Sequence, residues 1–148
     1  MITAARLAPR DPNGSHRFRV ELPTDLAQVG CVVEAVMECC NTVATVSSRT
    51  RFRLCTVVAE AVANAMVNGN RNDPGRLVIV DIEFDSDQIV IAVSDEGDGF
   101  DPEAVPDPTH PTTLDATRGR GLYMIRSLAD HVAFNDRGNT IWMTLPRC

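Results

Sequence analysis

Three short groups in this chain combine carboxylates, a side-chain amide and glycines. They are Glu60 with Asn64, Asp95-x-Gly97-x-Gly99, and Gly119-x-Gly121. An acid with an amide, an acidic glycine turn and a glycine-rich helix start are the parts that hold a metal, a base and a phosphate chain. Each group is weak evidence alone, but their order and spacing together indicate a nucleotide site.

Glu60 and Asn64 lie in a stretch whose apolar spacing predicts a helix from about Ser48 to Val67. Residues four apart share one helix face, so both polar side chains lie at the edge of the apolar face. In one interpretation Glu60 is a general base or orients a nucleophile, and Asn64 gives an oxygen to Mg²⁺. In the alternative, Asn64 caps a neighbouring carbonyl and Glu60 pairs with an arginine.

Asp95 comes at the end of a predicted strand. Gly97 and Gly99 then allow the backbone to turn tightly and to approach a ligand closely. A carboxylate beside an apolar slot can accept a hydrogen bond from the exocyclic amine of adenine. The alternative is an acidic turn that only ends the strand.

The segment Arg118-Gly119-Arg120-Gly121-Leu122 precedes a short helix predicted from Gly121 to Asp130. Glycines at a helix start expose backbone N–H groups to an anion, and the helix dipole adds to the attraction. Arg118 or Arg120 is a candidate to neutralise a terminal phosphate. Alternatively, one of the two arginines is only solvated.

The remaining pattern predicts an α/β two-layer sandwich, with helices on one face of a mixed, mostly antiparallel sheet. Residues 1–15 are expected to be a flexible tail, and residues 16–148 a single domain. Gly69 and Asn70 are expected to supply a left-handed stop to the second helix. The expected elements are strands at 17–22, 77–84, 88–94, 132–135 and 139–145, and helices at 24–43, 48–67 and 121–130.

Composition limits the partners. The net charge of −6 and the pI near 4.9 argue against general attraction to nucleic acid or anionic lipid. An acidic protein that binds a polyanion such as a nucleotide triphosphate needs a cation between the two, which again indicates magnesium. Five cysteines without a CxxC pair predict reduced thiols in a cytoplasmic protein, with Cys39 and Cys40 as packing residues. No apolar run approaches the roughly 20 residues of a membrane span.

The motif order resembles the GHKL ATPase superfamily. Its N box corresponds to Glu60-Ala-Val-Ala-Asn64-Ala65, its G1 box to Asp95-Glu-Gly97-Asp-Gly99-Phe100, and its glycine box to Gly119-Arg-Gly121-Leu122. The stretch from Glu60 to Asn70 is similar to the anti-sigma-factor serine/threonine kinases of bacteria. The resemblance covers about Phe18 to Leu145. It implies a Bergerat-type fold that binds ATP and Mg²⁺, with Glu60 as base, Asn64 as metal ligand, Asp95 as adenine contact, and an ATP lid from Asp101 to Arg118.

The resemblance predicts a protein serine/threonine kinase that inhibits a sigma factor and phosphorylates an anti-anti-sigma protein. It also implies a homodimer. One alternative is an ATP-gated binding module of the same fold that does not transfer phosphate. Another is the catalytic domain of a histidine kinase, which would need a phosphoacceptor histidine on a dimerisation helix, whereas His16, His110 and His131 are expected in other places. The presence of both Glu60 and Asn64 favours an enzyme, because binding of adenine alone needs neither residue.

Overall fold

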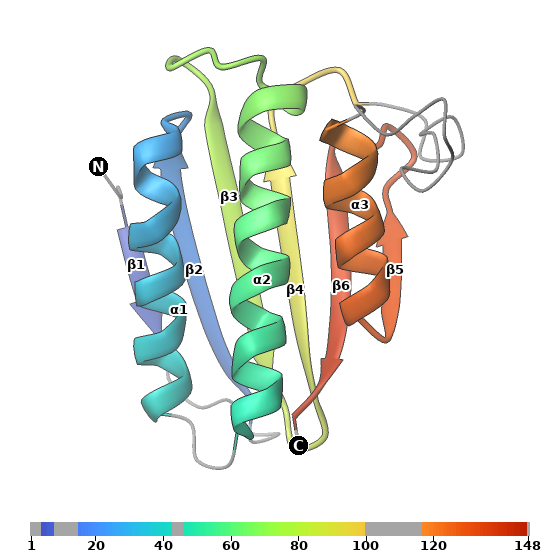
Figure 1. Cartoon of the computed structure of the whole chain (residues 1–148). Helices are drawn as coiled ribbons and strands as arrows, with labels where there is room; N and C mark the ends of the chain where they lie inside the picture. The colour runs from blue at the N-terminus through green and yellow to red at the C-terminus, as the bar shows by residue number, and fades with distance from the viewer. Residues whose placement is uncertain (1–3, 8–14, 43–45, 100–116, 148) are drawn as a thin grey trace.

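The computed structural model describes residues 4–7, 15–42, 46–99 and 117–147. These residues form two layers, with helices α1, α2 and α3 on one face of an antiparallel sheet (Figure 1). In chain order the elements are β1 Ala4–Leu7, β2 His16–Pro23, the 3-10 turn η1 Leu26–Gln28, α1 Val29–Thr42, α2 Ser48–Asn64, the π-helical turn η2 Ala65–Gly69, β3 Leu77–Phe84, β4 Gln88–Asp95, α3 Thr117–Leu128, β5 His131–Phe134 and β6 Thr140–Pro146.

The described sheet has six strands in the order β1-β2-β3-β4-β6-β5. The two-layer α/β arrangement expected from the sequence is confirmed, but each strand pairing in the described residues is antiparallel rather than mixed. Local turn chemistry explains the central hairpin. The Asp85 carboxylate accepts hydrogen bonds from the backbone N–H groups of Asp87 (2.8 Å) and Gln88 (2.7 Å), which fixes the β3–β4 turn.

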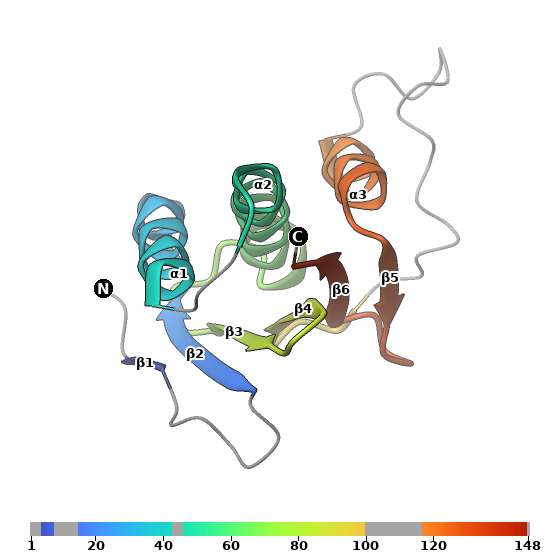
Figure 2. The same cartoon turned by 90° about the horizontal axis from the view of Figure 1, so that it is seen from below.

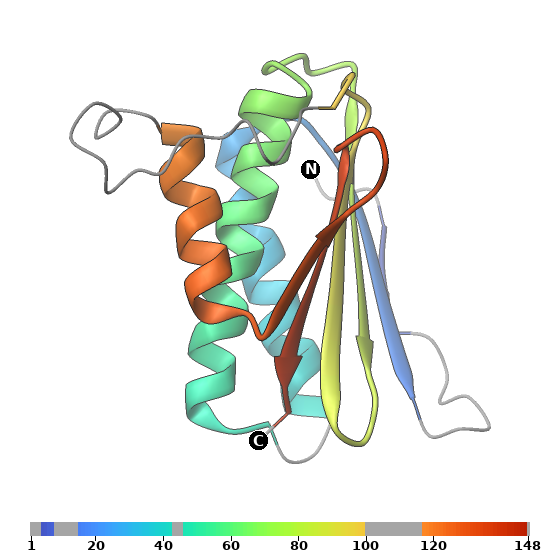
Figure 3. The same ribbon diagram turned by 90° about the vertical axis from the view of Figure 1, so that its right-hand side faces the viewer.

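The core lies between the sheet and the helices. Along β3, Val78, Val80, Ile82 and Phe84 are buried and alternate with half-buried residues, as a strand with one covered face requires. Figures 2 and 3 show all three helices on that covered face, and no described helix on the other. Burying each such side chain contributes roughly 1.5–3 kcal/mol, so the helices that carry polar site residues rest on a firm apolar layer.

Helix α2 begins where its cap predicts. The Ser47 hydroxyl accepts a hydrogen bond from the Thr50 N–H at 3.1 Å. At its other end the helix widens into η2, where the Asn70 N–H bonds to the Ala65 carbonyl at 2.7 Å. The expected left-handed stop at Gly69 and Asn70 is therefore wrong. The positive φ angles fall two residues later, at Arg71 (53°) and Asn72 (60°), because the π-helical turn continues the right-handed helical backbone through Asn70.

Two boundaries differ from the sequence expectation. Ala4–Leu7, placed in a flexible tail, forms β1 and pairs with β2 from Ala4↔Glu21 to Leu7↔Phe18. A four-residue strand is too short to show a periodic pattern, and the strand with which it pairs, β2, is separated from it in the sequence. Helix α3 begins at Thr117 rather than Gly121. The expected lid falls outside the described residues except for its last two positions.

Two cysteines have the packing role that the sequence predicts for them. Cys39 and Cys40 are both buried in the core, and burial raises the pKa of Cys39 to about 12 and that of Cys40 to about 11. Such thiols are protonated at neutral pH and are poor nucleophiles and ligands. In the described ranges, no helix has both the length and the apolar character to cross a membrane.

Candidate nucleotide-binding site

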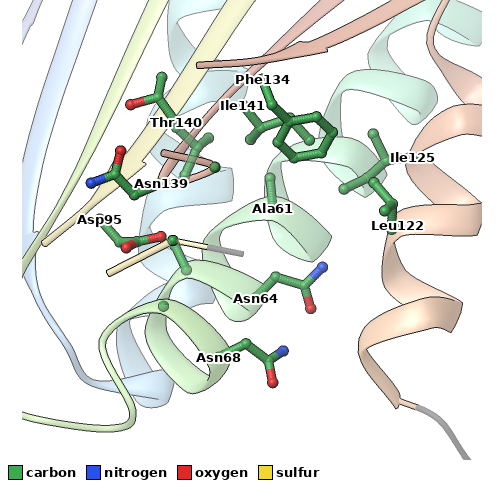
Figure 4. A pocket seen from close by; sticks show the side chains of 15 residues that line it. Ala61, Asn64, Asn68, Asp95, Leu122, Ile125, Phe134, Asn139, Thr140 and Ile141 are labelled. Carbon is green, nitrogen blue, oxygen red and sulfur yellow. The ribbon is translucent and has the colours of Figure 1, made fainter. Parts of the chain in front are cut away.

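A pocket opens where the C-terminal end of α2 and η2 meets α3 and the ends of β4, β5 and β6 (Figure 4). Its apolar lining comes from Ala61, Val93, Leu122, Ile125, Phe134 and Ile141. Its polar lining comes from Asn64, Asn68, Asp95, Asn139 and Thr140. An apolar slot with a few polar groups is the usual construction of a small-molecule site.

Asp95 is the last residue of β4 and stands at one side of this pocket (Figure 4). Its N–H donates to the Asn139 carbonyl at 2.9 Å, and its Oδ1 accepts from the Gly97 N–H at 2.8 Å. Gly99 has a φ of 86°, and a Cβ there would collide with the Arg137 carbonyl. Only glycine fits that approach, so the glycine turn predicted from the sequence is present and shapes the pocket wall.

The side chain of Asn70 holds the turn that follows Asp95 in place. Its side chain is buried, and its Oδ1 accepts from the Glu96 N–H at 2.8 Å. Its Nδ2 donates to the Thr24 hydroxyl at 2.9 Å and to the Leu77 carbonyl at 3.0 Å. From the other side, Asn139 Nδ2 donates to the Gly97 carbonyl at 3.2 Å. Two asparagines therefore clamp the segment after Asp95 to the sheet.

Sequence reasoning missed both clamping residues. The Asn70–Glu96 bond spans 26 positions and the Asn139–Gly97 bond spans 42, so no local pattern shows them. Asn68 also lines the pocket and was missed as a site residue. Its position four residues after Asn64 was a usable signal, because it continues the same polar stripe.

Glu60 and Asn64 lie against α3 at Gly121. A Cβ on Gly121 would stand 3.1 Å from Glu60 Oε2, 2.8 Å from Asn64 Nδ2 and 3.1 Å from Asn64 Oδ1. Both polar side chains are half-buried. Within the described ranges, neither forms a hydrogen bond or ion pair with another residue, so the structural alternative of a Glu60–arginine pair is not observed there. Their carboxylate and amide are available to a ligand.

The predicted site residues are not all in one place. Asn64, Asp95, Gly99 and Leu122 line the pocket, while Glu60 borders it one helical turn from Asn64. Arg120 instead lines a groove on the outer side of α2 and α3.

The glycine motif lies inside α3 rather than before it. Gly119 is the third residue of α3, so its N–H is among the first four, which have no partner within the helix. These groups still suit an anion. The side chain of Arg118 lies outside the description.

The family model of the histidine kinase-like ATPase domain matches residues 22–145. The chain belongs to this family. The match includes α2, the Asp95 turn and α3, so the three motifs and the pocket between them lie inside the family domain. Membership of an ATPase-domain family implies ATP as the nucleotide.

Curated relatives include two anti-sigma F factors. That of Oceanobacillus iheyensis is 31% identical over 94 residues, which cover 60% of this chain and 64% of the relative. That of Geobacillus stearothermophilus is 31% identical over 98 residues, covering 63% and 67%. The serine-protein kinase RsbW of Staphylococcus aureus strain JH9 is 36% identical over 96 residues, covering 59% and 60%. The chain thus spans about 60–67% of the length of these relatives.

The residues present fit ATP with magnesium. The apolar lining suits a purine ring, and the Asp95 carboxylate is the acceptor that an exocyclic amine needs. No cluster of three or more His, Cys, Asp or Glu side chains that could hold a metal occurs in the part of the chain that is described. A magnesium ion held by the Asn64 oxygen, phosphate oxygens and water needs no such cluster, because Mg²⁺ commonly binds through few protein ligands.

Proposed function

We propose that this chain is an ATP-dependent protein serine/threonine kinase that acts as an anti-sigma factor. It binds and inhibits a sigma factor and phosphorylates an anti-anti-sigma protein. The names of the relatives support this proposal. The observation that carries it is the position of Glu60 and Asn64, which lie together at Gly121 beside the pocket without partners in the described fold.

Each site residue has a role in this proposal. ATP, when bound with Mg²⁺, supplies the γ-phosphoryl group, and the metal offsets part of the phosphate charge. Asp95 accepts a hydrogen bond from the adenine amine, and Asn64 gives its side-chain oxygen to the metal. Glu60 accepts the proton of the attacking serine or threonine hydroxyl. The first-turn N–H groups of α3 bind phosphate oxygens.

The proposal extends to assembly and location. From the resemblance, the protein is expected to act as a homodimer in the cytoplasm, through protein partners rather than direct contact with nucleic acid or membrane. The alternative is an ATP-gated binding module without phosphoryl transfer. Glu60 favours the kinase over the binding module, because binding of adenine alone does not require a half-buried carboxylate near the phosphate end of the pocket.

The test is phosphoryl transfer from labelled ATP to a purified candidate anti-anti-sigma protein. For Glu60→Gln, which keeps size and reach, we expect transfer to fall by roughly 10²-fold or more, the usual share of general base catalysis, with ATP and sigma-factor binding near wild type. Glu38→Gln, at an exposed position of α1, is the matched control and should change nothing. Normal transfer by Glu60→Gln would remove Glu60 from catalysis. ATP binding without transfer to any candidate acceptor would favour the binding module.

A further inference from the structure

The outer side of the helical layer carries an apolar groove between α2 and α3, which lie side by side in Figures 1 and 2. We refer to it as the α2–α3 groove. It is lined by Phe52 and Thr56 of α2 and by Arg120, Tyr123, Met124 and Leu128 of α3. The exposed fractions of Phe52 and Tyr123 are 67% and 51%, so these large side chains face solvent.

Helix α3 therefore has two apolar faces. Leu122 and Ile125 are buried and line the nucleotide pocket, whereas Tyr123 and Met124 lie on the exposed side. A helix that only covers a core normally presents a polar outer face. A second apolar stripe, continuous with the exposed Phe52 of the neighbouring helix α2, is typical of a protein interaction surface.

The helices that form the groove are basic in an acidic protein. Three arginines in α2 and three in α3 make six of the fourteen arginines, whereas only one of the twenty acidic residues, Glu60, occurs in these helices. Glu60 lies at Gly121, beside the nucleotide pocket. The nearest carboxylate after α3 is Asp130. The chain as a whole carries −6, so these two helices have the opposite sign to the net charge.

Three exposed arginines flank the groove. Arg120 lines it, Arg49 stands three residues before Phe52, and Arg126 stands three residues after Tyr123. Residues three apart are neighbours on a helix surface. The ion pairs in the described ranges lie on β2, β3 and the Asp73–Arg76 turn, and neither Arg49 nor Arg126 takes part in one.

We propose that the α2–α3 groove binds an acidic amphipathic helix of a partner protein. The apolar face of that helix packs against Phe52, Tyr123 and Met124, and its carboxylates face the flanking arginines. In helix-in-groove binding, apolar anchor residues supply most of the affinity, whereas complementary charges set the orientation of the bound helix and raise the association rate. The inference goes beyond the proposed function, since docking here requires no phosphoryl transfer.

The test uses a fluorescein-labelled helical peptide of about 18 residues, with leucines at positions i, i+3, i+4 and i+7, about four glutamates at positions that flank them, and alanines elsewhere to favour the helix. The control peptide carries lysine in place of each glutamate. Fluorescence anisotropy should give at least roughly tenfold tighter binding of the glutamate peptide, with the difference shrinking as salt rises. Equal affinity for the two peptides would overturn the proposal.

Two pairs of variants locate the binding. Tyr123→Ser should weaken binding of the glutamate peptide by about tenfold, the loss typical of an aromatic anchor. Leu26→Ser is the matched control, because Leu26 is also 51% exposed but lies in η1, and it should bind like wild type.

The double variant Arg49→Glu/Arg126→Glu tests the charges and should lose the preference for the glutamate peptide over the lysine peptide. Arg17→Glu/Arg71→Glu, at exposed positions away from the groove and the nucleotide pocket, should keep it.

Unchanged ATP binding by each variant would show that the fold is intact. Peptide affinity that Tyr123→Ser leaves unchanged would place the binding elsewhere and overturn the proposal. A change of sedimentation coefficient in Tyr123→Ser, without peptide binding by wild type, would assign the groove to a second copy of this chain instead.

Discussion

The two ends of the nucleotide pocket are built differently. At the Asp95 end, the side-chain amides of the buried Asn70 and the half-buried Asn139 tie the glycine turn to the sheet. At the Glu60 end, two helices meet at a glycine, and the polar side chains bond to nothing in the described fold. Two asparagines six positions apart show the contrast. The side-chain oxygen and nitrogen of Asn70 both form hydrogen bonds within the protein. Neither side-chain atom of the half-buried Asn64 forms one in the described ranges.

This difference indicates what each residue is for. A buried amide that satisfies several backbone groups is costly to remove, because each orphaned group loses about 1–3 kcal/mol. An amide with no internal partner contributes little to folding and is available to a ligand. The comparison therefore predicts opposite phenotypes for the same substitution at the two asparagines.

The largest effect is expected for Asn64→Ala. Loss of outer-shell partners of a metal already costs about 10–100-fold in affinity, so loss of Asn64, the proposed direct ligand, should weaken magnesium-dependent ATP binding by at least roughly 100-fold. The free energy of unfolding without nucleotide should stay near wild type, because the Asn64 amide has no partner in the described fold. Calorimetric titration with and without Mg²⁺, together with urea unfolding, measures both quantities. ATP affinity that does not depend on Asn64 would remove the metal assignment.

The reverse is expected for Asn70→Ala. The free energy of unfolding should fall by about 2–3 kcal/mol, because the Glu96 N–H and the Leu77 carbonyl lose their buried partner. Urea denaturation measures this loss. Asn41→Ala is the matched control, since the Asn41 amide accepts from Arg51 at 2.8 Å on an exposed surface and should cost well under 1 kcal/mol. Equal stability of the two variants would refute the clamp.

The sequence predicted the parts of the fold that local rules determine. The alternation of β3 and β4 and the Asp85 turn are local, and both strands occur at the expected residues to within one position. The shared stripe of Glu60 and Asn64 follows from helical spacing alone. Asp95 follows from its place at a strand end.

The sequence did not show features that depend on distant partners. β1 exists because it pairs with the edge of β2. Helix α3 begins four residues earlier than its glycines indicated, since packing against α2 overrides their low helix propensity. The pocket walls from Phe134 and Ile141 come together only when β5 and β6 fold back beside β4.

A smaller effect is expected at the clamped end for Asp95→Asn. The amide keeps the shape but loses the charged acceptor, so ATP affinity should fall by about 1–2 kcal/mol, or roughly 5–30-fold. Discrimination between ATP and GTP should also narrow, because guanine carries a carbonyl where adenine carries the amine. Titration with each nucleotide checks both. Unchanged affinity for ATP in a folded variant would contradict the adenine assignment.

The smallest and most diagnostic effect is expected for Gly121→Ala. The new Cβ would crowd the ends of Asn64 and Glu60, which are flexible and can move aside, so the fold should survive. Alanine also favours a helix by about 1 kcal/mol over glycine, so the melting temperature should hold or rise. Phosphoryl transfer should nevertheless fall by about three- to tenfold, because Glu60 as the proposed base and Asn64 as the proposed metal ligand would lose their alignment. Gly30→Ala in α1 is the matched control, since no heavy atom lies within 4 Å of its Cβ position. It should gain helix stability and leave transfer unchanged. A Gly121→Ala variant with full activity would mean that α3 does not position Glu60 and Asn64, and the contrast between a clamped end and an end set by helix contact would fail.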